Sequence, residues 1–235
     1  IQGRAGTSVG CEQILTVTVG QSHDASMTLS KNKLTNVEPG SSDTVTVQIT
    51  NQGNGMETMS IGATGLPPGW QISFSQTSVT VGSSHSGNNK ETVTAEVFVP
   101  EDASAAEDTV ITFTVGRGGG STPYDTRDLT VSVAARHSVT TSILSIQQTG
   151  KTGQTVQFPI DVTNSGNIQD TFKLLACDPG DNTGCNPPMW ESSFSDSQGN
   201  TISQIILDPG QKQTLYLDIL VKARRMPTRP VCLHE

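Results

Sequence analysis

A short loop between two cysteines contains the residue types that could bind a metal ion. Cys177 and Cys185 flank a turn-rich segment that contains Asp178, Asp181 and Asn182. Two cysteines on either side of one turn can form a disulfide, and Ca²⁺ is bound in proteins by about six to eight oxygen ligands of this kind. We therefore expect a disulfide, typical of an oxidising compartment, and treat the three polar residues as calcium candidates. Two free thiols and a plain solvated loop are the alternatives.

No other group of residues has the spacing of a catalytic or zinc site. The segment Gly6–Gly10 matches the nucleophile pattern G-x-S-x-G, but that pattern needs a helix after the serine, and here a strand is expected. Gly150-Lys151-Thr152 is similar to the end of a phosphate-binding loop, but Ser145 stands where that loop requires glycine. The carboxylates of Glu101 and Asp102 fit a solvated turn. The histidines lack a partner at helical zinc spacing and are expected in loops or linkers: His23, His85, His137 and His234. The sequence thus predicts no catalytic residue and a chain that is not an enzyme.

The elements that position these residues are expected to be strands. Only 15% of the 235 residues are charged and 4% are aromatic, while Thr, Ser and Val are abundant. The formal net charge of −8 argues against nucleic acid as a partner, because nucleic-acid binding needs a basic surface. No apolar run is long enough for a membrane span. The chain begins at Ile1 and not at a methionine, so we expect the natural N-terminus to lie upstream.

An internal repeat is the strongest signal in the sequence. A shift of 113 residues takes Asn51 to Asn164 and Gly53 to Gly166, and both copies read Thr-Asn-x-Gly-Asn. Alternating apolar residues before this motif keep the same register, which is typical of half-buried strands. A third trace lies at the start, where Leu-Thr-Val-Thr-Val at 15–19 resembles Leu-Thr-Val-Ser-Val at 129–133.

The repeat predicts tandem immunoglobulin-like antiparallel β-sandwich modules in an all-β chain. Residues 1–20 are interpreted as the C-terminal strand of a preceding module, 21–135 as a complete sandwich, and 136–222 as a second sandwich that is C-terminally incomplete. Strands are expected over the following ranges: 25–30, 43–50, 57–63, 70–74, 78–81, 92–99, 109–115 and 128–133. Phe98 is expected to be half exposed or to lie at a module junction, and Pro159 should mark a sheet edge or bulge.

The last segment, 223–235, departs from the module pattern. It is rich in basic residues, whereas the first copy continues at this point with Pro100-Glu101-Asp102-Ala103 and two more strands. A reading-frame slip is one hypothesis, because Arg-Arg-Met-Pro codons contain Pro-Asp-Ala in a shifted frame. A genuine interaction arm is the alternative.

The residues around the first Pro-Pro turn resemble a known family. The segment Gly65-Leu66-Pro67-Pro68-Gly69-Trp70 follows Val-Thr-Val-Gln-Ile-Thr-Asn-Gln-Gly-Asn and is followed further on by Phe-Val-Pro-Glu-Asp-Ala. This arrangement resembles the NEW3 family, found beside glycosidase modules, and the related CARDB-type adhesion repeats of bacterial and archaeal surface proteins. The resemblance implies an immunoglobulin-like sandwich in an extracellular protein of many modules. It carries over no functional residues.

Two classes of function are compatible with these observations. The first is a non-catalytic structural or adhesive repeat module of a secreted or cell-surface protein. The second is an accessory, carbohydrate-associated domain of an extracellular hydrolase whose catalytic domain is not in this chain. In both, the expected partners are neighbouring modules of the same polypeptide and a protein or glycan surface ligand. Calcium is the only cofactor for which the sequence offers candidates.

Overall fold

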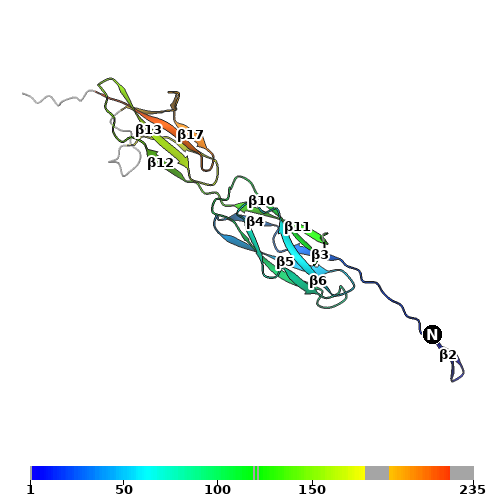
Figure 1. Ribbon diagram of the computed structural model, residues 1–235. Helices are drawn as coiled ribbons and strands as arrows, with labels where there is room; N and C mark the ends of the chain where they lie inside the picture. The colour runs from blue at the N-terminus through cyan, green and yellow to red at the C-terminus, as the bar shows by residue number, and fades with distance from the viewer. Residues whose placement is uncertain (1, 119, 121, 178–190, 223–235) are drawn as a thin grey trace, which may run out of the picture. The chain divides into compact units, whose positions relative to one another are not determined.

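The chain is built from β-strands. The computed structural model describes residues 2–118, 120, 122–177 and 191–222, and only the backbone of residues 2–5 and 8–12 (Figure 1). Across these residues it contains strands and turns but no helix. In the described part of the chain no helix is long and apolar enough to cross a membrane. The all-β expectation is confirmed.

The chain divides into two compact units. Unit 1 comprises Ile1–Leu34, Ser41–Val99 and Thr109–Val131, and unit 2 comprises Thr35–Gly40, Pro100–Asp108 and Ser132–Glu235. The loop at 100–108 therefore belongs to unit 2, although the strands on either side of it belong to unit 1. Strands β4 and β11 each begin in unit 1 and end in unit 2.

The strands at 25–133 form two antiparallel sheets. One sheet has the order β3-β5-β9-β7, and the other β4-β11-β10-β6-β8. Their bounds are β3 Ala25–Leu29, β4 Lys33–Val37, β5 Ser42–Asn51, β6 Glu57–Thr64, β7 Gln71–Phe74, β8 Ser78–Val81, β9 Lys90–Phe98, β10 Thr109–Arg117 and β11 Asp125–Val133.

Apolar residues at every second position close the core between these sheets. Val45, Val47 and Ile49 of β5 are at most 1% exposed, and the residues between them face solvent. Phe113 of β10 is fully buried and meets the ring of Phe74 edge to face, with ring centroids 5.9 Å apart. Since strand side chains alternate between the two faces of a sheet, this pattern fixes which face is buried.

Unit 2 contains a second, smaller pair of sheets. A five-stranded sheet has the order β12-β13-β18-β15-β16, and a two-stranded sheet pairs β14 with β17. Their bounds are β12 Val139–Ile143, β13 Thr155–Asn164, β14 Asp170–Lys173, β15 Ser192–Ser195, β16 Thr201–Ile202, β17 Gln204–Leu207 and β18 Lys212–Leu220. The core consists of Val162, Ile205, Leu207 and Leu215, with partly buried aromatic and aliphatic side chains packed against it.

The first residues form a separate hairpin. Strand β1 (Gln2–Ala5) pairs with β2 (Ser8–Glu12) in a two-stranded sheet of its own. A strand therefore does follow Gly6, as the pattern of the sequence predicts. Residues 13–24 then run on without regular secondary structure, so the alternating residues at 15–19 form no strand in this molecule.

The strand predictions for residues 25–133 are confirmed within a few residues at each end, and β4 is an additional strand. Phe98 is half-buried, as expected. Pro159 pairs with Tyr216 of β18 and accepts a hydrogen bond from Leu144 N at 3.0 Å, just beyond the end of β12. The proline thus lies where β13 loses its neighbour on one side, and its missing N–H leaves the pairing with β18 intact.

Candidate functional site

The predicted calcium loop lies almost entirely outside the described residues. Cys177 is described and is disulfide-bonded, whereas Cys185, Asp178, Asp181 and Asn182 are not described. Their roles as disulfide partner and calcium ligands stay predictions. Elsewhere, the residues that the structure describes bring no three His, Cys, Asp or Glu side chains within reach of one metal ion. The predicted atypical tail at 223–235 is also outside the described residues.

A fully buried asparagine closes one end of the first sandwich. The side chain of Asn51, at the end of β5, donates through Nδ2 to the carbonyl oxygens of Gly55 at 2.8 Å and Val81 at 3.2 Å. Its Oδ1 accepts from the backbone N–H of Gly53 at 2.8 Å. One side chain therefore bonds two backbone groups of the turn between β5 and β6 and the carbonyl oxygen at the end of β8.

Asn164 makes the same set of hydrogen bonds in unit 2. It is 0% exposed, and its Nδ2 donates to Ile168 O at 2.8 Å and Leu207 O at 2.9 Å. Its Oδ1 accepts from Gly166 N at 2.9 Å. Gly166 and Ile168 each lie 113 residues after their counterparts in unit 1, Gly53 and Gly55. Leu207 does not follow this shift, but it is the last residue of β17, as its counterpart Val81 is the last residue of β8. The Thr-Asn-x-Gly-Asn motif is thus a structural device that ties a turn to a strand end.

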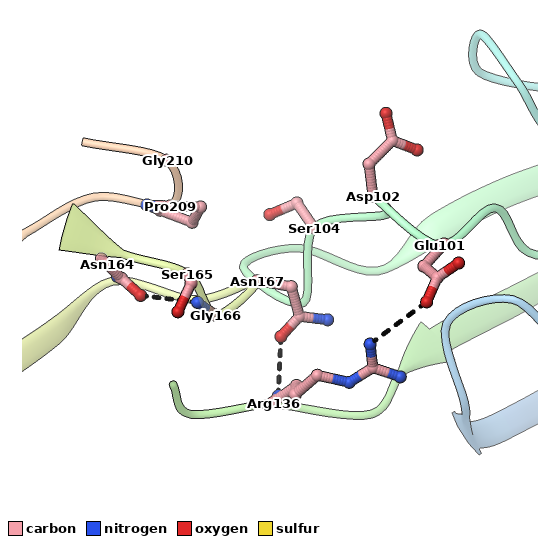
Figure 2. Close-up of a pocket in the computed structure, with 10 residues that line it drawn as sticks. All are labelled: Glu101, Asp102, Ser104, Arg136, Asn164, Ser165, Gly166, Asn167, Pro209 and Gly210. Atoms are coloured by element: carbon pink, nitrogen blue, oxygen red, sulfur yellow. Dashed lines mark hydrogen bonds and ion pairs between the residues drawn. The ribbon is translucent and has the colours of Figure 1, made fainter. Parts of the chain in front are cut away.

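A pocket with a volume of about 680 Å³ lies in unit 2 (Figure 2). Its ten lining residues come from the loop at 100–108, the segment before β12, and the turns after β13 and β17: Glu101, Asp102, Ser104, Arg136, Asn164, Ser165, Gly166, Asn167, Pro209 and Gly210. Glu101 and Asp102, which the sequence places in a solvated turn, therefore also line a pocket.

Asn167 is the central polar group of this pocket. Its Oδ1 accepts from Arg136 N at 2.7 Å, and its Nδ2 donates to Ala103 O at 3.1 Å and Ala134 O at 3.0 Å. Arg136 Nη1 lies 3.9 Å from the Glu101 carboxylate, and Figure 2 shows Asp102 pointing away from that pair. These groups are engaged with backbone and with one another, so the lining residues contain no paired nucleophile and base.

A buried carboxylate in unit 1 has the densest set of titratable neighbours. The Glu57 side chain, at the start of β6, is 6% exposed; its Oε1 accepts from the Tyr124 hydroxyl at 2.8 Å, and its Oε2 lies 3.1 Å from Nδ1 of His23. Arg117 Nε lies 3.9 Å from Oε1. Burial, together with the hydrogen bond and the negative charge of Glu57, raises the pKa of Tyr124 above its ordinary value. His23, Glu57 and Arg117 border a pocket of about 410 Å³.

The same acid–histidine contact occurs in unit 2. His137 Nδ1 lies 2.8 Å from Oδ2 of Asp170, the first residue of β14. The hydrogen bond from His137, with one from Thr171 N, lowers the pKa of the Asp170 carboxyl. In each unit the histidine lies in the segment before the first strand of the sandwich, and the acid is the first residue of the strand after the asparagine turn, β6 or β14. The contact thus joins that segment to that strand. This recurrence favours anchoring of that segment over proton-transfer chemistry as the role of the Glu57 cluster.

Sequence reasoning placed His23 and His137 in loops or linkers and missed their carboxylate partners. Both lie in segments without strand structure, so the placement is right, but each is held by an acid. A signal was present: the shift of 113 that relates the motifs takes Glu57 to Asp170, and a shift of 114 takes His23 to His137. Two chemically complementary positions that recur together indicate a contact.

Comparison with known proteins gives structural likeness only. No family model matches the chain, and no curated protein matches it. Solved structures that are similar include WR4, an MSP family member of C. elegans, at 8% identity and a TM-score of 0.29, covering 46% of this chain and 97% of that one. A protein of unknown function from Porphyromonas gingivalis W83 is 13% identical with a TM-score of 0.29, covering 82% of each chain. The class 5 fimbriae chaperone CfaA is 10% identical with a TM-score of 0.29, covering 84% of this chain and 100% of its own. The pairing of the strands within the chain itself defines its immunoglobulin-like β fold.

Proposed function

We propose that this chain is a non-catalytic structural or adhesive repeat segment of a secreted or cell-surface protein of many domains. The duplicated asparagine scaffold carries the proposal. Asn51 and Asn164 make equivalent hydrogen bonds to a turn and to a neighbouring strand end, and each is completely buried. The most elaborate polar groups in both units thus hold the fold together, as expected of a module that acts as a spacer or presents loops.

The chemistry of Cys177 supports an extracellular location. Its sulfur is in a disulfide, and disulfides persist mainly in oxidising compartments. The acidic net charge of −8 suits a surface that meets proteins or glycans better than one that meets nucleic acid.

Location is tested in the cells that produce the protein. Intact cells are treated with a protease that cannot enter them, and the segment is followed with an antibody raised against residues 25–133. We expect the segment to be cleaved, or to be found in the medium, while an intracellular marker survives. Protection of the segment until the cells are lysed would overturn the proposal.

Ligand binding separates the adhesive from the accessory-domain alternative. The purified chain is applied to an array of glycans and to immobilised surface proteins, with the Asn51→Ala variant at a temperature that unfolds unit 1 as the control. Selective binding to the polysaccharide substrate of a hydrolase encoded in the same reading frame would favour the accessory domain. Binding to surface proteins, or further repeats in that frame, would favour the structural or adhesive module.

A further inference from the structure

Unit 2 has an apolar groove that stays open in its sandwich. The groove has a volume of about 400 Å³ and lies between the five-stranded sheet and β14. Its apolar lining comes from five strands and the residues just after one of them: Val139 and Ile143 of β12, Ile160 and Val162 of β13, Phe172 of β14, Leu174 and Leu175 just after β14, Phe194 of β15 and Leu215 of β18. Contiguous apolar surface of this kind is a common place for another chain to bind.

The same face is covered in the first sandwich. There β10 pairs with β6 and buries Ile111, Phe113 and Val115 completely, and β11 pairs with β10. Strand β14 follows the asparagine turn as β6 does, and in the described residues it pairs with β17 alone. Its other edge therefore has backbone groups without a strand neighbour, and an exposed edge is a template for a further strand.

The apolar side chains of β12 that line the groove are more exposed than their counterparts in β3. Ala25 in β3 is 3% exposed, whereas Val139, which lies 114 residues later in β12, is 46% exposed. Ile143 at the other end of β12 is 56% exposed, and its counterpart Leu29 is half-buried. Among the residues that the structure describes, no strand takes the position beside β14 that β10 takes beside β6.

The chain also has a strand-like segment that belongs to no sheet. Leu15, Val17 and Val19 are 71%, 84% and 76% exposed, in a stretch without secondary structure. Their sequence, Leu-Thr-Val-Thr-Val, differs by one residue from the Leu-Thr-Val-Ser-Val of β11, whose apolar residues Leu129, Val131 and Val133 are 0%, 0% and 6% exposed. The spacing of the three side chains also equals that of Ile111, Phe113 and Val115 in β10.

We propose that residues 15–19 of one molecule add as a strand to the open edge of β14 in a second molecule. Leu15, Val17 and Val19 enter the groove at alternate positions, while the backbone pairs with β14. Strand addition of this kind combines main-chain hydrogen bonds with pockets for every second side chain. Since donor segment and groove are different surfaces of the chain, the contact is heterologous, and one molecule can donate its segment to a neighbour while it accepts the segment of another. This inference does not depend on the proposed location or adhesive role.

Sedimentation of the full chain tests the donor segment. We expect the weight-average mass of the wild type to rise with concentration to more than twice that of one chain, and Val17→Asp to remain a monomer with an unchanged melting temperature. Ile14→Asp is the matched control, because Ile14 is also apolar and 88% exposed but lies on the opposite side of an extended segment. It should associate like the wild type.

Matched isoleucines test the groove. Ile143→Asp, which lines the groove, should abolish association, whereas Ile206→Asp, at a residue 57% exposed on β17 that does not line it, should not. A mixture of Val17→Asp and Ile143→Asp then retains one intact groove and one intact segment, so we expect it to form dimers and nothing larger.

Several results would overturn the inference. A wild type that is monomeric at every concentration would do so, as would equal behaviour of Val17→Asp and Ile14→Asp, or a mixture that stays monomeric. A monomeric wild type whose melting temperature falls on Val17→Asp would show that the segment fills the groove of its own chain. A wild-type oligomer that Ile143→Asp leaves intact would place the contact elsewhere.

Discussion

The side-chain amides of Asn51 and Asn164 make hydrogen bonds to backbone N–H and C=O groups, as a peptide group of a neighbouring strand would. Each amide has two N–H donors and one carbonyl acceptor, and all three are bonded to backbone in a place that water does not reach. Aspartate has the same shape but no N–H, so it would direct lone pairs at two carbonyl oxygens. The asparagine is therefore required chemically as well as sterically.

Replacing either asparagine by alanine should destabilise the unit that contains it. Asn51→Ala and Asn164→Ala each remove three side-chain hydrogen bonds to the backbone from a buried position, and we expect the free energy of unfolding to fall by about 3 kcal/mol. Urea unfolding followed by circular dichroism measures the change. Gln52→Ala is the control, since Gln52 is exposed and its side chain bonds only to Ser26 Oγ at 3.3 Å, and it should change stability by less than about 0.5 kcal/mol. An equal loss in all three variants would contradict the assignment.

Acid should weaken unit 2 through Asp161. A hydrogen bond from Lys212, followed in importance by one from Thr214, lowers the pKa of the Asp161 carboxyl. The folded state therefore favours the charged carboxylate more than the unfolded chain does. The resulting stability is present above the unfolded pKa, near pH 4, and is lost as the pH falls through the lowered folded value.

Asp161→Asn tests this pH dependence. The variant should have a lower melting temperature than the wild type near neutral pH, and the difference should shrink as the pH falls below about 4, because the wild-type carboxyl is then protonated too. Scanning calorimetry at a series of pH values gives the comparison. A difference that stays constant down to the lowest pH would contradict the role of Asp161, since Asp170 and Asp196, whose pKa values are also lowered, are unchanged in the variant.

Residue types alone predicted part of the polar structure. In the first copy the Thr-Asn-x-Gly-Asn motif falls between two expected strands, but the sequence does not predict that its first asparagine is buried or bonded to Val81 and Leu207, because those partners lie 30 and 43 residues away in the chain. Contacts of that separation depend on how the sheets are paired. Local patterns contain no information about them.

At the scale of elements, β10 shows how side chains that alternate between the two faces of a strand form a core on one of them. It lies between β11 and β6, and its inward residues are fully buried, while Val110, which points the other way, is 49% exposed. Its ring contact with Phe74 joins the two sheets. Loss of the Phe113 side chain should therefore weaken the packing of both sheets.

Phe113→Ala should lower the stability of the first sandwich by about 3–5 kcal/mol, because it removes a fully buried ring and leaves a cavity. Phe113→Leu keeps most of the volume and should cost much less. Near-ultraviolet circular dichroism and urea unfolding report the change. If alanine and leucine have the same effect, cavity formation is not the cause.

Strand prediction succeeded where alternation was regular and failed at β4. In that strand Leu34 and Val37 are buried but stand three residues apart, and Asn36 between them has a positive φ of 55°. A left-handed residue interrupts the alternation of faces, so the period of two on which the prediction rests is absent. The open groove beside β14 could be expected in outline, since the second copy was predicted to be incomplete.

At the scale of the whole molecule, each unit has its own core, and a change in one can be tested against the other. Cys177 belongs to unit 2 and is disulfide-bonded. Reduction should increase hydrogen exchange in β14, which ends four residues before Cys177, and leave β10 in unit 1 unchanged. The physical reason is that a disulfide restricts the unfolded chain and so stabilises the folded state around it.

Mass spectrometry after deuterium labelling, with and without reductant, measures this difference. Cys177→Ser should reproduce the effect of the reductant on β14 and should then be insensitive to it. Faster exchange in β10 to the same extent would show that reduction acts on the molecule generally.

Gly53 and Gly166 are positions where a side chain would collide with the chain that enters the sandwich. A Cβ at Gly53 would overlap the carbonyl oxygen of Ser22, and one at Gly166 the carbonyl oxygen of Arg136. In any further copy of this sandwich, the backbone that enters the sandwich would leave no room for a Cβ at this position. A glycine two residues after the buried asparagine is therefore required unless that backbone segment moves. Wherever the parent gene continues, occurrences of Asn-x-Gly at intervals near 113 residues would give the number of sandwiches it encodes and the point at which each one begins.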